Sequence, residues 1–338
     1  MKKMLGTIGI VIICSLIAYF AVPLRQADAK PITLKYSNFF PPTNRISILC
    51  DQWCQEVEKR TNGRVKVNYF PGGALTKPAQ TYDGVKSRIA DIGLTFAGYT
   101  RGRFPLTEVF SVPLGIKTGY QGTKTANAYY NHFKPKELDE VKVIYLHTSP
   151  PHHLFTKKPV TKLEDLKGMK IRSGGDVATL VKALGGAPVS MPMSEAYDAL
   201  SKGVVDGIVA PFEPMKGFRL AEVVNYATIM EEFYAGLAFV VMNKDKWNAL
   251  PADIQAIIDQ INEEWIEKQG LLWDDYDKEG KNYFIEKGGK IFTLNKAENA
   301  RFSELLRPVA DAYISRMKEK GLPGAEVYKF CVDYIKAH

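Results

Sequence analysis

Short runs of β-branched and aromatic residues alternate with longer amphipathic segments along this chain, and this alternation constrains the fold more than any other feature. Residues 32–36 read as a strand, residues 45–60 carry apolar side chains at helical spacing, and residues 65–69 read as a second strand. A helix is predicted over 79–88 and a strand over 91–96. Such units predict an α/β fold, in which loops at the carboxyl ends of the strands are free to form a site.

A second block of the same pattern begins near residue 141. Its predicted strands are 141–147, 169–172, 188–191 and 204–210, and its predicted helices are 177–184 and 194–201. Residues 238–242 read as a strand that crosses back toward the first block. A chain of this length usually forms two lobes or domains, which fits two such blocks.

From Pro251 onward the apolar residues keep helical spacing over a long stretch. They are Ile254, Ile258, Ile261, Trp265, Leu272 and Tyr276. Pro251 suits the first turn of a helix. One helix of about 50 Å, at 1.5 Å per residue, would exceed the width of one domain and act as a strut across both lobes. The alternative is two helices broken near Gly270 or Gly280.

Residues 1–29 have the three parts of a secretory signal peptide. Two lysines precede an apolar run over 5–21, and Ala27 and Ala29 supply the small residues that a signal peptidase reads. This pattern predicts export to the periplasm with cleavage after Ala29. The alternative is an uncleaved membrane anchor, because the apolar run approaches the length of a membrane span.

The charge balance disfavours nucleic acid as a partner. Loss of residues 1–29 removes three basic residues and one acidic residue, which lowers the formal net charge from +8 to +6. The remaining basic residues alternate with acidic ones, whereas nucleic-acid binding needs a concentrated basic face. An anionic small molecule is compatible with this balance.

The residue patterns predict neither catalysis nor a metal site, and no cofactor is expected. The sequence contains no G-x-S-x-G, H-E-x-x-H, P-loop or G-x-G-x-x-G motif. His152 and His153 are adjacent, so on a strand they face opposite sides, and no acidic or cysteine cluster stands nearby. Cys50, Cys54 and Cys331 remain after cleavage; they either form one disulfide in an oxidising compartment or stay buried as small apolar residues.

Several short motifs occur in the order found in one transport family. Residues 162–172 read KLEDLKGMKIR. This stretch resembles the L-x-D-L-K-G-x-K-x-R segment of the solute-binding proteins of tripartite ATP-independent periplasmic (TRAP) transporters, in the C4-dicarboxylate-binding (DctP) branch. Further matches are FPGG at 70–73, GVK at 84–86, ADIG at 90–93, GGAP at 185–188, SEAYDAL at 194–200, GVVDG at 203–207 and VMNKDKW at 241–247.

The resemblance covers essentially the whole mature chain. It implies a two-lobed periplasmic binding protein, type II-like, with crossing hinge strands, a long helix spanning both lobes and closure around a ligand. Residues 30–149 plus 236–275 are expected to form the amino-terminal lobe, and residues 150–235 plus 276–338 the carboxyl-terminal lobe. It also implies a partner, the TRAP membrane permease, which uses an ion gradient. The alternatives are the binding protein of an ATP-driven (ABC) importer and a ligand-sensing subunit for an organic acid.

Arg172 is the first candidate for the ligand anchor. It stands at the end of a predicted strand, where a guanidinium can bind a carboxylate through two parallel hydrogen bonds. The resemblance implies that this arginine grips the ligand carboxylate; the alternative is a surface arginine. His152 stands where members that bind acidic sugars often have a second arginine. An imidazole gives less anion affinity at neutral pH, which disfavours a dicarboxylate or sialic acid.

Apolar side chains replace a polar one elsewhere in the expected site. Ala210 stands where many members have a ligand-binding asparagine, and Phe212 and Glu213 follow it. The next segment adds Tyr234 and Phe239. The amino-terminal lobe is expected to contribute Asn38, Phe39, Phe96 and Tyr99 from strand ends.

Apolar walls with one charged anchor predict a monocarboxylate that has a hydrophobic or aromatic body. Candidates are aromatic or indole-type acids, phenyl-substituted oxo acids and branched-chain oxo acids. A small polar hydroxy or oxo acid is the alternative.

Overall fold

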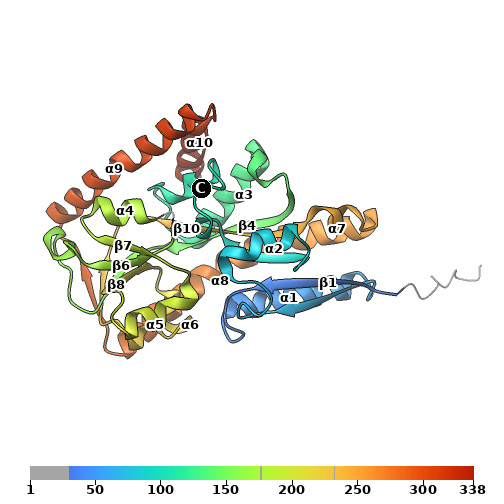
Figure 1. Cartoon of the computed structure of the whole chain (residues 1–338), viewed down its shortest axis with the longest axis horizontal. Helices are drawn as coiled ribbons and strands as arrows, with labels where there is room; N and C mark the ends of the chain where they lie inside the picture. Colours follow the sequence, from blue (N-terminus) through green and yellow to red (C-terminus); the bar gives the residue numbers. More distant parts are fainter. Residues whose placement is uncertain (1–29, 176, 232) are drawn as a thin grey trace, which may run out of the picture.

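The computed structural model describes residues 30–175, 177–231 and 233–338 (Figure 1). The predicted signal peptide and its cleavage site after Ala29 lie outside these residues. The strands are β1 (Ile32–Asn38), β2 (Val65–Phe70), β3 (Ile92–Phe96), β4 (Val141–Pro151), β5 (His153–Thr156), β6 (Lys170–Ser173), β7 (Ala187–Ser190), β8 (Gly207–Ala210), β9 (Tyr226–Ile229), β10 (Ala235–Asn243) and β11 (Lys290–Thr293). The α-helices are α1 (Arg45–Arg60), α2 (Thr81–Lys86), α3 (Gly119–Phe133), α4 (Ala178–Ala183), α5 (Ala196–Ser201), α6 (Glu213–Gly217), α7 (Lys244–Asn248), α8 (Ala252–Glu286), α9 (Lys296–Glu319) and α10 (Gly324–Ala337).

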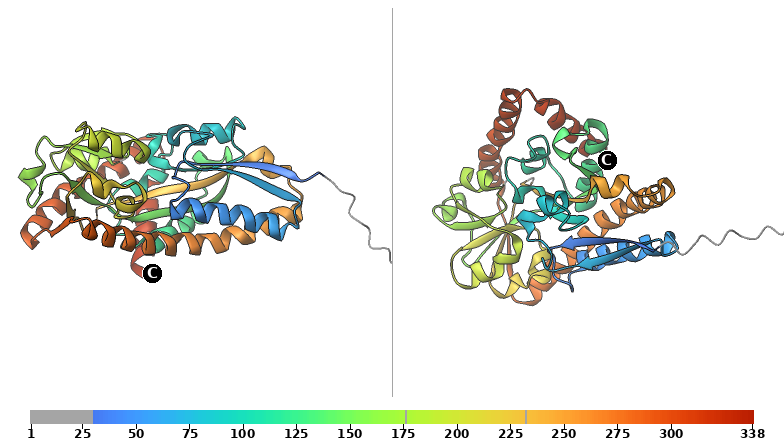
Figure 2. Two further views of the ribbon diagram at one scale, coloured as in Figure 1. Left: turned by 90° about the horizontal axis from the view of Figure 1, so that it is seen from below. Right: turned by 45° about the vertical axis from the view of Figure 1, so that its right-hand side comes forward.

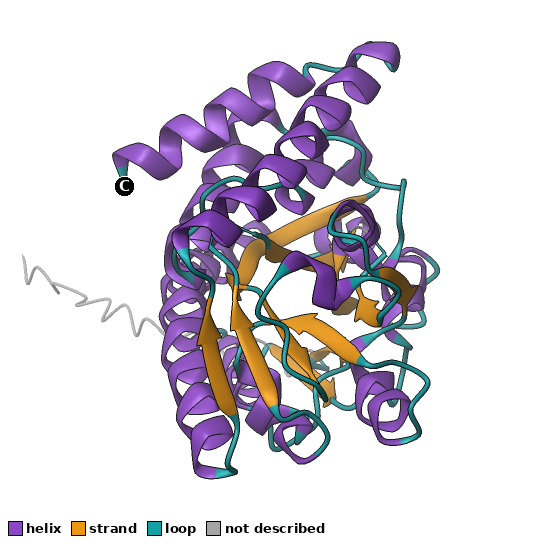
Figure 3. Ribbon diagram, turned by 90° about the vertical axis from the view of Figure 1, so that its left-hand side faces the viewer, coloured by secondary structure: helices purple, strands orange, loops and turns teal. Residues whose placement is uncertain are grey.

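Two mixed sheets form the cores of two lobes, as the α/β prediction expects. The first sheet has the order β2-β1-β3-β10-β4, and the second has the order β11-β9-β5-β8-β6-β7. In the first, β10 runs antiparallel to β3 and β4; in the second, β5 runs antiparallel to β8 and β9. Figure 3 views the molecule from the side of the second lobe.

The chain crosses between the sheets at two adjacent places. β4 passes into β5 through His152, and β10 begins at Ala235, a few residues after β9 ends at Ile229. The two crossings are bonded to each other, since the backbone N–H of His152 donates to the carbonyl of Tyr234 at 2.7 Å. His152 and Tyr234 therefore lie side by side where the lobes join.

Helix α1 shows how the sequence encodes an element that later positions the site. The Asn44 side chain accepts from the backbone N–H of Ile46 and caps the amino terminus. Leu49, Trp53 and Val57 are buried on one face. The helix ends before Asn62 and Gly63, both of which have positive φ.

The stretch after Pro251 is one continuous helix, so the prediction of a single strut is confirmed. Helix α8 has 35 residues, and Pro251 stands at its N-cap. It packs against α1, α3 and β4 of the first lobe and against α6 of the second. Figure 2 shows it running along both halves of the molecule. Of the six apolar positions that predicted it, only Leu272 is half-buried; the others are buried.

The carboxyl-terminal helices contact both lobes. Helix α9 packs on α4, yet the Tyr313 hydroxyl donates to the carbonyl of Leu106 at 2.9 Å. Helix α10 packs on α3. The expected lobe boundaries, including the assignment of 276–338 to the second lobe, therefore stay a prediction.

Among the described residues, no helix is long and apolar enough to cross a membrane. The three cysteines in this part of the chain, Cys50, Cys54 and Cys331, are free and buried.

Candidate ligand-binding cavity

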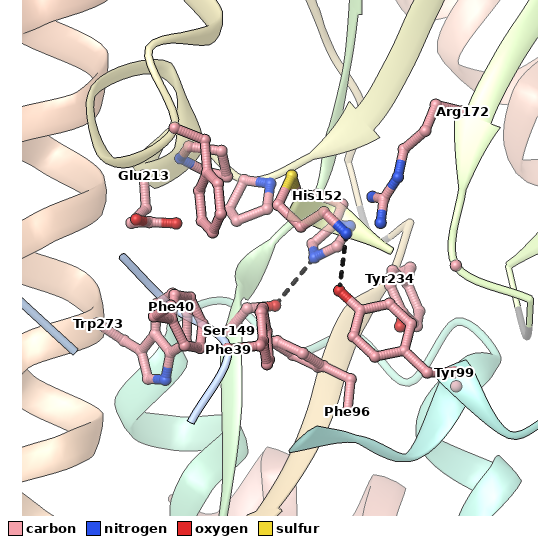
Figure 4. A pocket seen from close by; sticks show the side chains of 16 residues that line it. Phe39, Phe40, Phe96, Tyr99, Ser149, His152, Arg172, Glu213, Tyr234 and Trp273 are labelled. Atoms are coloured by element: carbon pink, nitrogen blue, oxygen red, sulfur yellow. Dashed lines mark hydrogen bonds between the residues drawn. The ribbon is translucent and has the colours of Figure 1, made fainter. Parts of the chain in front are cut away.

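A cavity lies between the lobes, where parallel strands of both sheets end (Figure 4). The cavity has a volume of about 40 Å³, counted as the space open to the centre of a water molecule. Its lining consists of Phe39, Phe40, Phe96, Gly98, Tyr99, Ser149, His152, Arg172, Gly174, Met193, Pro211, Glu213, Pro214, Phe218, Tyr234 and Trp273.

Arg172, the predicted anchor, lies at one side of this cavity. It is only 3% exposed and comes from β6, the strand between β7 and β8. Its Nε and Nη2 donate to the carbonyl of Met191 at 3.1 and 2.7 Å. No carboxylate lies within ion-pair distance of Arg172 in the described ranges. A buried guanidinium without a counter-ion is costly, and it supplies the charge that an anionic ligand would balance.

His152 lies in the cavity beside Arg172 as a neutral imidazole. Burial, followed by the charges of Arg172 and His153, lowers the pKa of His152 well below its ordinary value. Its Nε2 lies 2.9 Å from Ser149 Oγ, which already accepts from the backbone N–H of Gly236. The Ser149 hydroxyl either donates to Nε2 or accepts from it, according to which ring nitrogen of His152 carries the hydrogen. Nδ1 has no hydrogen-bond partner among the described residues.

The two adjacent histidines point to different places, with His152 between β4 and β5 and His153 at the start of β5. His153 Nδ1 accepts from the backbone N–H of Met230 at 3.3 Å, and its ring packs on Phe212. No group of metal-ligating side chains is found in the part of the chain that the structure describes.

Aromatic rings form most of the cavity wall. Phe39 contacts Tyr99 edge-on with ring centroids 5.7 Å apart, and the Tyr234 ring meets the His152 ring edge-on at 4.6 Å. Phe96 also lines the cavity, as predicted. Such a lining favours an apolar or aromatic ligand body.

Several lining residues were missed by the sequence analysis. Phe40 stacks on Phe39 at 4.3 Å and contacts Phe218 and Trp273. Trp273 comes from the middle of α8, and its Nε1 donates to His147 Nδ1 at 2.9 Å. Helical spacing marks such a tryptophan as buried without showing what it faces. Phe40 had a local signal, because it follows Phe39 at the same strand end.

Glu213 lies at the side of the cavity opposite Arg172 (Figure 4) and is 1% exposed. Asn44 Nδ2, from the first lobe, donates to its Oε1 at 2.7 Å. Burial raises the pKa of Glu213 to about 8, with the Asn44 hydrogen bond opposing this and the nearby Asp277 carboxyl adding to it. The Glu213 side chain is therefore mostly protonated at neutral pH.

Three of the expected lining residues lie elsewhere. Phe212 turns away after Pro211, and its ring packs against Phe155 and Phe284. Asn38 is buried and donates to Ser47 and Tyr69, which ties β1 to α1 and β2.

The third, Phe239, faces the opposite side of β10 and contacts Tyr82 and Phe104. All three corrections have one cause: a strand end fixes the position of a residue, whereas local backbone geometry fixes the direction of its side chain.

The lobes touch each other around the cavity. The backbone N–H of Met193 donates to the Tyr99 hydroxyl across the lobes at 3.2 Å. A Cβ on Gly175 would lie 3.1 Å from the carbonyl oxygen of Gly98, so the backbones approach closely there. Together with the bond from Asn44 to Glu213, these contacts define a closed arrangement.

Two lobes joined by crossing strands, with a cavity between them, define a two-lobed solute-binding protein. A family model described as bacterial extracellular solute-binding protein, family 7 (DctP), matches residues 36–316. The chain belongs to this family, the periplasmic solute-binding proteins of TRAP transporters.

Solved structures of this class resemble the chain along most of its length. A marine metagenome TRAP solute-binding protein from an unidentified microbe, specific for aromatic acid ligands and bound to metahydroxyphenylacetate, is 29% identical, with a TM-score of 0.87 and coverage of 90% of this chain and 99% of its own. A TRAP solute-binding protein from Rhodoferax ferrireducens with copurified benzoate is 28% identical, with a TM-score of 0.86 and coverage of 91% and 98%.

A third structure, an open complex from Desulfovibrio salexigens, is 32% identical over 91% of this chain and 96% of its own, with a TM-score of 0.79. Its lower TM-score at higher identity fits the closed lobe contacts of the present structure.

Proposed function

We propose that the mature chain is the extracytoplasmic subunit of a TRAP transporter that captures a small apolar or aromatic monocarboxylate in the periplasm and delivers it to the membrane permease. The observation that carries this proposal is Arg172, a buried cation at one side of an apolar cavity with no carboxylate partner in the described ranges.

Arg172 is proposed to bind the ligand carboxylate. Its Nε and Nη2 are held by the Met191 carbonyl, which orients the guanidinium and leaves Nη1 and the second hydrogen of Nη2 for the ligand. His152, in the tautomer that carries its hydrogen on the unpaired Nδ1, is proposed to supply a further donor without a second full charge. One cation and one neutral donor suit a ligand with one carboxylate group better than a ligand with two.

The walls and the size of the cavity support a compact, apolar ligand body. The rings of Phe39, Phe40 and Tyr99 offer flat apolar surfaces. The cavity volume of about 40 Å³ suits a ligand body of about one ring or one short branched chain. The similar proteins bound to benzoate and to metahydroxyphenylacetate support an aromatic acid as the first candidate.

Capture is proposed to follow a clamshell closure. A ligand favours the closed arrangement only through contacts that it gains there, so both lobes have to touch it. The cavity lining meets this condition, since Phe39 and Trp273 belong to the first lobe and Arg172 to the second. Closure removes water and strengthens the ion pair at Arg172.

The test is a thermal-shift screen of mature protein, residues 30–338, against benzoate, phenylacetate, indole-3-acetate, phenylpyruvate, a branched-chain oxo acid, lactate, succinate and sialic acid. Selective stabilisation by aromatic or branched apolar acids supports the proposal. Stabilisation only by succinate or sialic acid would show that another residue supplies a second positive charge, and the ligand class would be wrong. Uptake of the best acid by vesicles carrying the cognate permease, dependent on added mature protein and on an ion gradient, tests delivery.

A further inference from the structure

The Glu213 carboxyl is a further polar group of the cavity lining, and the proposed function leaves it without a role. Its Oε1 accepts from Asn44, whereas no side chain or backbone group of the described ranges donates to Oε2, which is not among the fully buried unpaired atoms. Because Glu213 lines the cavity, Oε2 is open to a ligand group that can hydrogen-bond to it. Figure 4 shows this carboxyl group across the cavity from Arg172, so it faces the end of the ligand remote from the carboxylate.

The surroundings of Glu213 favour hydrogen bonding over ion pairing. The groups that face it are Asn44 before α1 and Tyr276 and Asp277 of α8. No cation pairs with Glu213 among the described residues. The Asp277 carboxyl accepts from the backbone N–H of Glu213 at 2.9 Å, which fixes the start of α6.

The packing around Glu213 holds its carboxyl in place. A Cβ on Gly217 would lie 2.0 Å from Glu213 Oε1 and 2.6 Å from Asn44 Nδ2. Any larger residue at this position would displace the pair. The Glu213–Asn44 contact thus occupies a space that only glycine leaves open.

We propose that Glu213 is a specificity-determining residue that binds a hydroxyl group on the ligand body, which makes the ligand a hydroxylated aromatic monocarboxylate. This inference rests on the proposed function, in which Arg172 holds the carboxylate. A hydroxyl both donates and accepts, so it pairs with Oε2 whether Glu213 is protonated or ionised. A second carboxylate at this end would meet the Glu213 and Asp277 carboxyl groups, and no cation pairs with Glu213 among the described residues.

The experiment is isothermal titration calorimetry of the mature protein with phenylacetate, its 2-, 3- and 4-hydroxy derivatives, and 3- and 4-carboxyphenylacetate. We expect at least one hydroxy derivative to bind about tenfold more tightly than phenylacetate, the gain of one buried hydrogen bond. Both carboxy derivatives should bind more weakly than phenylacetate.

The matched variants are Glu213→Met, which keeps the side-chain length without polar atoms, and Glu213→Gln, whose amide can still donate to a hydroxyl. The readout is the ratio of two affinities, that for the best hydroxy derivative over that for phenylacetate, and it does not depend on the absolute affinity of a variant. In Glu213→Met this ratio should fall to within about twofold of one. In Glu213→Gln it should be largely kept. Glu195→Met, at an exposed glutamate of the same lobe, should keep the wild-type ratio.

Each failure points to a different step. Wild-type protein that binds phenylacetate without preferring any hydroxy derivative, or a Glu213→Met variant that keeps the preference, would overturn the role of Glu213 and leave the proposed function standing. Wild-type protein that binds none of these monocarboxylates would overturn both. If Glu213→Met does not fold, the wild-type ligand series and Glu213→Gln still decide the question.

Discussion

At Arg172 a full positive charge is held in a nearly dry site by one backbone carbonyl. Replacement by alanine should raise the Kd for the best acid of the screen about 100-fold or more, because truncating one partner of a buried charge pair costs roughly 2–5 kcal/mol. Arg172→Lys should lose about tenfold, since a lysine keeps the charge but not the two parallel hydrogen bonds. Calorimetry measures both.

The control is Arg219→Ala, at an exposed arginine paired with Glu222 in the same lobe. It should leave the Kd within about twofold of wild type, as expected for a surface ion pair. An Arg172→Ala protein with nearly normal affinity would show that the anchor lies elsewhere.

The protonated Glu213 predicts an unusual dependence of stability on pH. Its pKa is about 8 in the folded protein and near the ordinary 4.3 in the unfolded chain. The folded state thus binds this proton more tightly, so the stabilisation is complete below the unfolded pKa and is lost as pH rises through 8. Asp277, with a pKa raised by burial to about 7, acts in the same direction.

Urea unfolding at pH 6 and pH 9 tests this. The unfolding free energy of the wild type should fall from pH 6 to pH 9. That of Glu213→Gln should fall by less, and the two losses should differ by on the order of 2–4 kcal/mol. Asp277 titrates in both proteins, so only its coupling to the Glu213 charge differs between them. Equal losses would mean that Glu213 is already ionised at pH 6.

At the scale of single residues, the sequence located the proposed anchor in the cavity more accurately than it located the walls. Arg172 carries a motif, and a strand end directs it toward the cavity. Phe212 follows a strand end too, but the turn into α6 points its ring into the core. Trp273 reaches the cavity from a helix far along the chain, and only the tertiary packing of α8 reveals it.

At the scale of elements, the two glycines within α8 mark contacts and not breaks. A Cβ on Gly270 would lie 2.9 Å from Tyr120 Cα of α3, and a Cβ on Gly280 would lie 2.2 Å from the carbonyl oxygen of Phe212. Sequence spacing predicted the helix but could not decide between a break and a close approach, because glycine serves both.

Gly280→Ala therefore tests the contact between α8 and α6. Alanine favours a helix over glycine by about 1 kcal/mol, but the clash with backbone should outweigh this and destabilise the protein by about 1–3 kcal/mol. It should also weaken ligand binding, because Phe212 adjoins Glu213. Lys278→Ala, at an exposed position of the same helix, should change the unfolding free energy by less than about 0.5 kcal/mol. A Gly280→Ala protein more stable than wild type would mean that α6 is free to move away.

At the scale of the whole molecule, the bond between Asn44 and Glu213 joins the lobes directly. The Asn44 side chain makes two hydrogen bonds: its Oδ1 caps α1, and its Nδ2 donates to Glu213. Asn44→Ser separates them, because serine caps a helix about as well but is too short to reach Glu213. We expect a more open ligand-free protein and a Kd raised about 3- to 10-fold, as for the loss of one hydrogen bond. Small-angle X-ray scattering reports the opening, and calorimetry reports the Kd.

The matched control is Asn295→Ser, which makes the same change at the N-cap of α9, where the side chain accepts from the backbone N–H of Glu298 at 2.9 Å and joins no lobes. Both variants keep a capping side chain, but only Asn44→Ser leaves the buried Glu213 Oε1 without its partner. Asn44→Ser should therefore lose more unfolding free energy than Asn295→Ser, and it alone should alter the radius of gyration and the affinity. Saturating ligand should return Asn44→Ser to the wild-type closed dimensions, since contacts to Arg172 and the aromatic walls still favour closure. If both variants behave alike in scattering and in binding, the Asn44–Glu213 bond accompanies closure without stabilising it, and the ligand alone drives the lobes together.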